Sequence, residues 1–220
     1  MLVNPRIRED FIFDPSLVLY LPLYKPDGAS FMSGDAYGHL CTVTGALWQS
    51  NGRLFDGIND KIALGALDAF NLGTHDFTLE AWVNTSDKEV YPLGKWQDDN
   101  NRWYFRIEAT VGYIFVFGKA GGVTLLNING TTGIADGSWH HMVVTGIRGV
   151  RGYVYLDSVD DSSGTVTCSA TDMDNTAALE VGKYTADFYD GLIGELRMYN
   201  RALNPMEVQH NYLATKWRYK

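Results

Sequence analysis

The run YDGLIGELRMYNRALNPMEVQHN, residues 189–211, decides the fold, because it joins an alternating segment to a short segment with helix signals. The even-numbered residues from Leu192 to Met198 fall on one face, and the odd-numbered residues from Ile193 to Tyr199 fall on the other. This period of two is that of a β-strand. The run therefore predicts a strand that closes a β-rich domain.

The second half of the run carries the signals of a helix start. Asn204 is suited to cap the first amides, Pro205 to occupy the first helical position, and Glu207 stands three residues after the cap. Upstream, short β-rich runs separated by Gly, Asp and Asn recur every ten residues or so, which predicts roughly a dozen antiparallel strands.

Several upstream segments precede this ending in a fixed order. They are LVLYLPL (17–23), GRLFDGINDKIALG (52–65), FTLEAWV (77–83), GSWHHMVVTGIRGVRGYVYLD (137–157) and LEVGK (179–183). Taken together they resemble the laminin G-like and pentraxin-like group of concanavalin A-type jelly rolls. The resemblance implies an all-β, antiparallel two-sheet jelly-roll sandwich with a short C-terminal helix. This fold carries lectins, adhesion modules, virion components and some hydrolases, so it leaves the function open.

We divide the chain into an N-terminal arm, residues 1–16, and a single laminin G-like domain, residues 17–220. The arm, MLVNPRIREDFIFDPS, has two prolines and mixed charge. We favour the interpretation that it lies along its own sandwich over the alternative that it docks on a neighbour. Cys41 and Cys168 are interpreted as buried free thiols, with a disulfide as the alternative.

Composition excludes some partners. With 18 Lys and Arg against 26 Asp and Glu, the net charge is −8, and the absence of a basic cluster argues against nucleic-acid binding. No apolar stretch approaches the roughly 20 residues that span a bilayer, so we expect no membrane insertion. LVNPRIREDF after Met1 lacks the apolar core of a signal peptide. We expect a virion or extracellular location reached without a recognisable signal peptide.

The second face of the FTLEAWV strand, which carries Thr78, Glu80 and Trp82, offers one candidate site. One hypothesis places it on a concave surface together with Glu195, Arg197, Tyr104 and Arg106, where aromatic rings and charged groups would suit a sugar. The favoured alternative is ordinary cross-strand pairing of Glu80 or Glu195 with Arg197 beneath a covering loop.

The loop KWQDDNNRWY, residues 95–104, is the best candidate for recognition. Its tryptophans could stack on a sugar, and its Asp and Asn side chains could bind hydroxyls. The alternative is a hairpin turn whose two tryptophans pack inward. The candidate ligand-binding residues are Trp96, Asp98, Asp99, Asn100, Asn101, Trp103 and Tyr104.

Calcium is the only cofactor that the resemblance suggests, because relatives hold it with loop carboxylates and carbonyls. The candidate metal ligands are Asn59, Asp60 and Asp190, while Asp56 is assigned to its Asp-Gly turn. No calcium-loop motif is present, and Gly194 stands where relatives often have an aspartate.

No strand carries the alternating acidic residues with which glycosidases on this fold place two carboxyls about 5 Å apart. We therefore expect a non-enzyme. We expect a binding or structural module that recognises or attaches to glycans. Its expected setting is a virion, as a capsid decoration or tail component. The alternative is a structural virion or assembly protein with no sugar ligand, and a glycoside hydrolase ranks third. The expected partners are a glycan or protein surface, a second copy of the chain, or a larger viral assembly.

Overall fold

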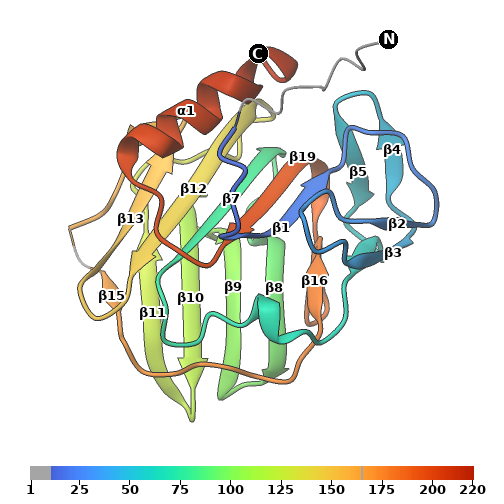
Figure 1. Cartoon of the computed structure of the whole chain (residues 1–220). Helices are drawn as coiled ribbons and strands as arrows, with labels where there is room; N and C mark the ends of the chain where they lie inside the picture. Colours follow the sequence, from blue (N-terminus) through green and yellow to red (C-terminus); the bar gives the residue numbers. More distant parts are fainter. Residues whose placement is uncertain (1–10, 165) are drawn as a thin grey trace, which may run out of the picture.

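The computed structural model describes residues 11–164 and 166–220, and these form two antiparallel sheets packed face to face (Figure 1). Sheet A comprises, in spatial order, β14 (Val159–Asp160), β13 (Arg151–Leu156), β12 (Trp139–Ile147), β7 (Phe77–Asn84), β19 (Asp190–Tyr199), β5 (Gly52–Asp56) and β4 (Leu47–Gln49), with β1 (Leu17–Pro22) also paired to β19. Sheet B comprises β15 (Thr167–Cys168), β11 (Val123–Asn129), β10 (Ile114–Ala120), β9 (Asn101–Ile107), β8 (Val90–Asp98), β16 (Leu179–Val181), β6 (Lys61–Ala63), β3 (Leu40–Thr44) and β2 (Ser30–Met32).

The other elements connect or cover the sheets. They are a small hairpin of β17 (Lys183–Tyr184) and β18 (Asp187–Phe188), the 3-10 turns η1 (Asp68–Phe70) and η2 (Lys216–Arg218), and the helix α1 (Pro205–Thr215). The predicted fold class, a two-sheet antiparallel sandwich with a short C-terminal helix, is confirmed. No helix in the described ranges is long and apolar enough to cross a membrane.

The core lies between the sheets and follows the strand alternation. On β7 the residues Phe77, Leu79, Ala81 and Val83 are buried in it, as the alternation predicts. Cys41 is also buried in this core, and the prediction that it and Cys168 are free thiols is confirmed.

The alternation predicted for β19 is wrong before Gly194. Ile193 pairs with Val83 and Glu195 pairs with Trp82, so Gly194 is an extra residue in a β-bulge. Because of the bulge, Ile193 faces the core together with Leu196 and Met198. The predicted alternation had placed Ile193 on the opposite face from these two residues. A glycine is required here, because a Cβ on residue 194 would lie 2.3 Å from Cε1 of Tyr219.

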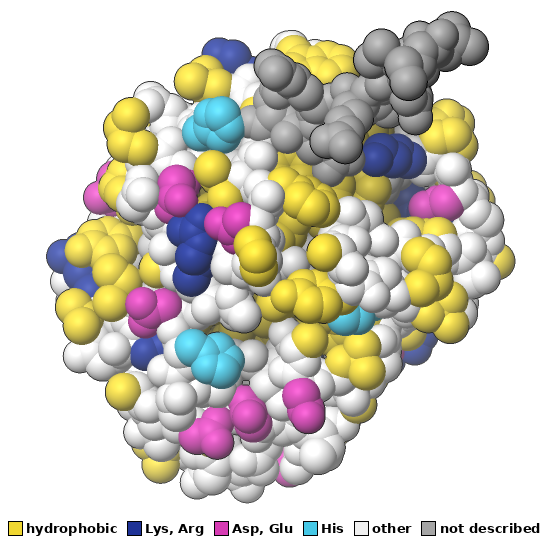
Figure 2. Space-filling model, in the orientation of Figure 1, with side chains coloured by type: hydrophobic (Ala, Val, Ile, Leu, Met, Phe, Trp, Pro, Cys, Tyr) yellow, Lys and Arg dark blue, Asp and Glu magenta, His cyan; other side chains and the backbone are white. Residues whose placement is uncertain are grey.

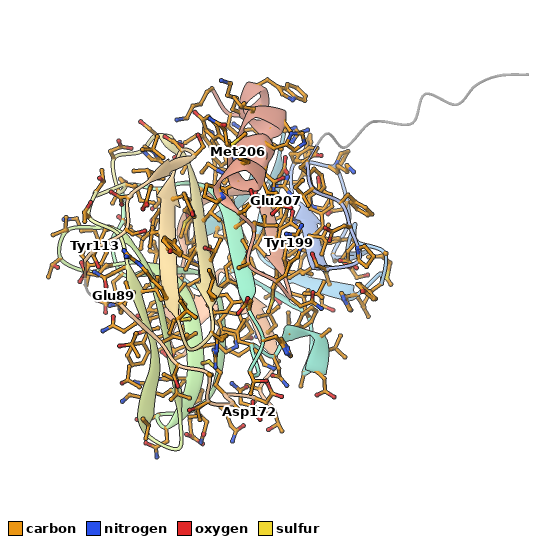
Figure 3. All side chains as sticks on the ribbon, turned by 60° about the vertical axis from the view of Figure 1, so that its left-hand side comes forward. Glu89, Tyr113, Asp172, Tyr199, Met206 and Glu207 are labelled. Atoms are coloured by element: carbon orange, nitrogen blue, oxygen red, sulfur yellow. The ribbon has the colours of Figure 1, made fainter. Side chains whose placement is uncertain are left out.

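The helix begins as predicted. The side chain of Asn204 accepts hydrogen bonds from the amides of Met206 and Glu207, and the amide of Asn204 donates to Oε2 of Glu207 at 2.9 Å, which completes a capping box. In Figure 1, α1 lies across the outer face of sheet A beside β12 and β13. Figure 3 shows Tyr199 lying beneath the helix that carries Met206 and Glu207.

A buried charge network fills the space between β7, β19 and α1. The guanidinium of Arg197 contacts Oε1 of Glu80 at 2.5 Å and also pairs with Glu195. His141 contacts Glu80 at 2.8 Å, and Asn211 of α1 donates to the other carboxylate oxygen at 2.8 Å. Burial alone would raise the pKa of Glu80, but Arg197 and these hydrogen bonds outweigh it and hold the pKa at about 2.

This network corrects one hypothesis from the sequence. The outer face of sheet A is closed by α1, so it is not an open sugar-binding surface, and the favoured pairing of glutamate with Arg197 is confirmed, with a helix as the cover. The residues that the hypothesis brought together are split between the two sheets: Glu80, Trp82, Glu195 and Arg197 belong to sheet A, whereas Tyr104 and Arg106 belong to β9 of sheet B.

Residues 1–10 of the predicted arm lie outside the described residues. Further along, Phe11 packs on Tyr20, with ring centroids 4.8 Å apart, and the amide of Ile12 donates to Oδ1 of Asn211 at 2.8 Å. Residues 11–16 therefore run along the outer face of sheet A next to α1. Figure 2 shows this side of the molecule, where hydrophobic side chains gather in the middle.

Candidate functional site

The outer face of sheet B carries a cluster of aromatic side chains. Trp103 and Phe105 of β9 point into the core, so Tyr104 between them points outward. Tyr104 meets Tyr91 of β8 and Tyr184 of β17 at ring-centroid distances of 5.3 and 4.8 Å. Phe115 and Phe117 of β10 pack against the three tyrosines and remain half-buried. The cluster spans four strands and is not covered by a helix.

Arginine is placed among these rings. Nη1 of Arg106 donates to the hydroxyl of Tyr91 at 3.1 Å, and its guanidinium lies 5.2 Å from the ring centroid of Tyr104. Glu89 is 3.6 Å from the same guanidinium. Arg106 thus presents a planar cation stacked on aromatic rings, and such a surface binds polar groups while its rings bind apolar ones.

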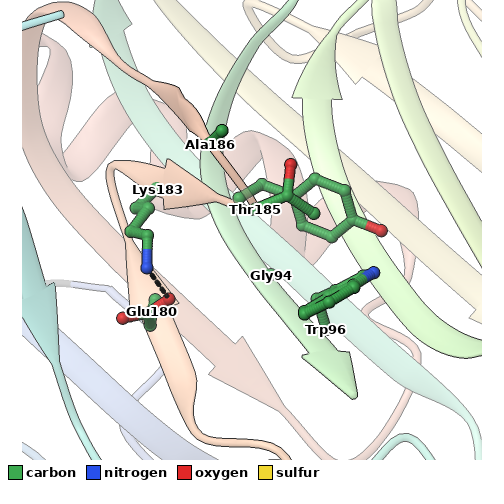
Figure 4. A pocket seen from close by; sticks show the side chains of 7 residues that line it. Gly94, Trp96, Glu180, Lys183, Thr185 and Ala186 are labelled. Atoms are coloured by element: carbon green, nitrogen blue, oxygen red, sulfur yellow. Dashed lines mark ion pairs between the residues drawn. The ribbon is translucent and has the colours of Figure 1, made fainter. Parts of the chain in front are cut away.

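A pocket of about 230 Å³ opens beside this cluster, where the β17–β18 hairpin folds over β8. It is lined by Gly94, Trp96, Glu180, Lys183, Tyr184, Thr185 and Ala186. Figure 4 shows the indole of Trp96 across the pocket from Thr185, with the ion pair between Lys183 and Glu180 at its side. Gly94 keeps the floor open, because a Cβ there would lie 3.0 Å from the ring of Tyr184.

The polar groups of this pocket differ in whether they have hydrogen-bond or ion-pair partners. Glu180 accepts from Lys61 at 2.7 Å and lies 3.2 Å from Lys183, so its charge is neutralised. The hydroxyl of Tyr184, by contrast, is buried and has no hydrogen-bond partner among the described residues. Burial raises the pKa of Tyr184 further above neutral pH, so the side chain is a protonated hydroxyl that serves as a hydrogen-bond donor.

The hairpin that carries Tyr184 is strained at its tip. Thr185 has φ of 54°, in the left-handed region that a β-branched residue rarely adopts. Strain of this kind costs about 1–3 kcal/mol and is concentrated at binding sites and clamps. The strained residue lines the pocket, which points to the hairpin as part of a binding site.

The predicted recognition loop is a tight hairpin. β8 continues to Asp98 and β9 begins at Asn101, so only Asp99 and Asn100 lie in the turn. The carboxylate of Asp98 accepts from the amides of Asn100 and Asn101 at 2.7 and 2.9 Å, and Asp99 contacts Arg102 at 2.5 Å. These contacts give the acidic residues a role in the turn, as the alternative interpretation held.

The two tryptophans of this segment face opposite ways. Trp103 is fully buried in the core, so its ring offers no stacking surface to a ligand. Trp96 is 44% exposed and lines the pocket, and Tyr104 lies in the neighbouring cluster. The structure thus brings Trp96 and Tyr104 to one face and places Asp98 to Asn101 at the hairpin end. Trp103 is no longer a candidate ligand-binding residue, because it is buried. Ligand binding by the remaining residues stays a prediction.

The candidate metal ligands lie near the ends of β5 and β19. Asp60 is buried, and its Oδ2 accepts from the amide of Asp56 at 3.0 Å. The carboxylate of Asp56 accepts from the amides of Ile58 and Asn59, which is the turn role assigned to it. Burial and the charges of Asp87 and Asp56 raise the pKa of Asp190. No group of three or more His, Cys, Asp or Glu in the described ranges could hold a metal ion. Calcium binding stays a prediction.

Sequence reasoning missed the contribution of the β17–β18 hairpin, and with it Glu180, Lys183 and Tyr184. The segment KYTADF has Thr-Ala at its turn, without the Gly or Asn that marks a two-residue hairpin. The available signal was the pair of aromatic residues, Tyr184 and Phe188, on either side of the turn.

The chain belongs to the concanavalin A-like lectin/glucanases superfamily, whose family model matches residues 56–209. No curated protein matches the sequence.

Among solved structures, the chain is similar to domain 4 of AbnA, a GH43 extracellular arabinanase from Geobacillus stearothermophilus, in complex with arabinotriose. That match has a TM-score of 0.71 and 16% identity, and it covers 90% of this chain and 98% of the domain. The binding domain of botulinum neurotoxin DC in complex with rat synaptotagmin II matches with a TM-score of 0.70 and 13% identity, over 90% of this chain and 52% of that one.

A Trypanosoma rangeli sialidase in complex with sialic acid matches with a TM-score of 0.63 and 19% identity, over 93% of this chain and 34% of that one. The chain thus spans about half the length of the toxin binding domain and about a third of the sialidase. At these identities the similarity shows a shared fold.

Proposed function

We propose that the outer face of sheet B binds glycans without catalysing a reaction on them. The observation that carries the proposal is the buried, unpartnered hydroxyl of Tyr184 in a pocket whose other wall is the exposed indole of Trp96. A sugar has both of the surfaces that this pocket requires, since its C-H face stacks on an indole and its hydroxyls accept and donate hydrogen bonds.

Each lining group takes a defined role in this proposal. Trp96 stacks on one sugar ring, and the Tyr184 hydroxyl donates to a sugar oxygen. Lys183 and Glu180 bind further hydroxyls, and the charge of Glu180 is already paired with Lys183 and Lys61. The neighbouring cluster of Tyr104, Phe115 and Phe117 extends the surface for a longer chain. The complex of the similar arabinanase domain with arabinotriose supports a glycan as the ligand class.

The chemistry of the pocket favours binding over hydrolysis. Glu180 is the only carboxylate among its lining residues, and it is held by two lysines. Glycosidases of the common type need two carboxyls, one of them with a raised pKa, on either side of the scissile bond. We therefore propose a module that attaches to glycans, with attachment on a virion or outside a cell as its setting.

Replacing Trp96 with Ala is expected to weaken glycan binding at least about tenfold, the loss typical of a central aromatic contact. The matched control is Trp48→Ala, because Trp48 is 43% exposed and lies on β4 of the other sheet. The measurement is a glycan array, with calcium and with chelator, followed by titration calorimetry of the array hits and by thermal unfolding of each variant.

If a folded Trp96→Ala variant bound glycans as tightly as the unmodified protein, the proposal that the outer face of sheet B is the binding site would be wrong. A blank array for the unmodified protein, together with a defined oligomer by mass in solution, would instead support the assembly alternative and a protein partner.

A further inference from the structure

The outward side of α1 carries a row of exposed side chains that is mostly apolar. Met206, Leu213 and Trp217 are 72%, 51% and 69% exposed, and His210 between them is exposed as well. The four residues follow one another at intervals of four, three and four, which is the spacing of a coiled-coil seam. Figure 1 shows α1 at the surface, on the side of sheet A away from sheet B. The row thus has the pattern of a helix–helix interface and faces solvent.

The indole of Trp217 is held in one position although it is exposed. Its Nε1 donates to the carbonyl of Ala214 at 2.9 Å, and the guanidinium of Arg218 lies 4.6 Å from its ring centroid. Arg218 is itself anchored by the buried carboxylate of Glu195. A side chain that is ordered before binding loses little entropy when it binds, and tryptophan is enriched at the centres of protein interfaces. Trp217 therefore has the properties of an interface anchor.

An apolar pocket opens at the other end of α1, between the start of the helix and strands β12, β13 and β14. Its volume is about 470 Å³, large enough to admit an indole. Its walls include Ile147, Tyr153, Tyr155, Leu203 and Pro205, together with the carboxylate of Asp160. Pro205 and Trp217 are separated by roughly 18 Å at the rise of a helix, so the indole of one chain cannot fill the pocket of the same chain.

The charges beside the indole and beside the pocket are opposite. Lys216 precedes Trp217, and its Nζ lies 5.5 Å from the ring centroid of Tyr212. Asp160 is exposed, and its Oδ1 accepts from the amide of Ser162 at 2.9 Å. Neither Lys216 nor Asp160 forms a salt bridge with a described residue. An indole that entered the pocket from another copy would bring its neighbouring ammonium toward this carboxylate.

We propose that two copies of the chain form a symmetric dimer in which their α1 helices lie antiparallel and each Trp217 enters the pocket of the other copy. The antiparallel order sets the end with the indole beside the end with the pocket, so the same contact forms twice. It also places the helix dipoles in opposite directions, and it brings each Lys216 to an Asp160.

The partner is a second copy because the spacing of the row fits a helix, and α1 is the only α-helix in the described ranges. The indole, the pocket and the two opposite charges are all present on one chain, as a self-complementary interface requires. The dimer uses the outer side of sheet A. The outer face of sheet B therefore stays open in both copies, and the inference does not depend on glycan binding there.

Sedimentation velocity of the full chain over a wide range of protein concentration tests the dimer. The expected result is a reversible monomer–dimer equilibrium, which Trp217→Ala weakens at least about tenfold. Below the dissociation constant, thermal unfolding of this variant should match that of the unmodified protein, because the indole is exposed in a single copy. Trp96→Ala is the control, since it removes the exposed tryptophan of sheet B and should dimerise as before.

A charge exchange tests the contact between copies directly. Asp160→Lys and Lys216→Glu each place like charges at both contacts, so either variant alone should associate at least about tenfold more weakly. An equimolar mixture has opposite charges at both contacts and should form heterodimers with nearly the original affinity. The control is Lys119→Glu on β10 of sheet B, because Lys119 also lies beside an aromatic ring, 5.8 Å from the centroid of Phe117.

The inference would be overturned by a chain that stays monomeric at every concentration. A dimer that persists unchanged in Trp217→Ala would also contradict it, and so would a mixture of the two charge variants that associates no better than either variant alone.

Discussion

Replacing Arg197 with Met is expected to lower the free energy of unfolding by about 3–5 kcal/mol. Glu80 and Glu195 would lose the guanidinium that lies between them, and both are buried on the face beneath α1. Met fills most of the aliphatic volume of Arg, so the loss arises from Glu80, which would keep only His141 and Asn211 as side-chain partners. The guanidinium also lies 4.0 Å from the ring centroid of Phe11, so residues 11–16 should loosen as well. Urea unfolding followed by tryptophan fluorescence measures the change.

The pH dependence of this loss gives the control. The pKa of Glu80 is about 2 in the folded protein, below its ordinary value of 4.5, so its contribution to stability is present above pH 4.5 and is lost as the pH falls toward 2. In Arg197→Met the pKa of Glu80 should rise, and protonation should relieve the unpaired charge. The difference between the two proteins should therefore shrink between pH 4.5 and 2, and Glu80→Gln should rescue part of the loss. A difference that stays constant with pH would contradict this account.

Replacing Trp82 with Ala is expected to cost about 3–5 kcal/mol, because a fully buried indole is removed from between β7 and α1. Its ring stacks on Tyr219 at 4.5 Å, and its Nε1 donates to Oγ1 of Thr215 at 2.8 Å. The variant would leave a cavity beneath the last turn of the helix, and the Thr215 hydroxyl would keep only its hydrogen bond to the carbonyl of Asn211. Thermal unfolding and hydrogen exchange of the α1 amides measure the effect.

Two comparisons test the cause. Trp82→Phe keeps an aromatic ring and should lose less than half as much stability as Trp82→Ala. Trp217→Ala removes an indole that is 69% exposed and should change stability little. If Trp82→Ala left α1 as protected from exchange as before, the proposed role of this ring in docking the helix would be wrong.

The contrast between Trp82 and Trp96 shows what the sequence could predict. The helix start at Asn204 and the alternation of Phe77 to Val83 are local patterns, and both are confirmed. Which face of a strand meets solvent is decided by what packs on the sheet. The favoured interpretation of the sequence places a cover over the face that carries Trp82, but local patterns do not indicate that the cover is α1, or that the outer face of sheet B stays open at Trp96.

The sequence also failed to predict the face on which some strand residues lie. A single extra residue at Gly194 reverses the faces of β19, and the ring of Tyr219, 25 residues further along the chain, leaves room only for glycine at that position. Trp103 is a candidate ligand-binding residue of the segment 95–104, yet it lies in β9 with its ring in the core, as the hairpin alternative predicts for it. The loops 65–76 and 169–178 are joined by buried Lys95 and Arg148, which reach them from parts of the chain distant in sequence. No short pattern records such contacts.

The position of β19 also decides when this domain can form. It lies between β7 on one side and β1 and β5 on the other, so the middle of sheet A is filled by the last of the described strands of this domain to be synthesised. Until Tyr199 has been synthesised, β7 is an open edge with apolar side chains on its inner face. Until β19 joins them, the two parts of sheet A in a nascent chain are exposed to pairing with other chains. A fragment that stops before Asp190 should therefore aggregate instead of folding in part.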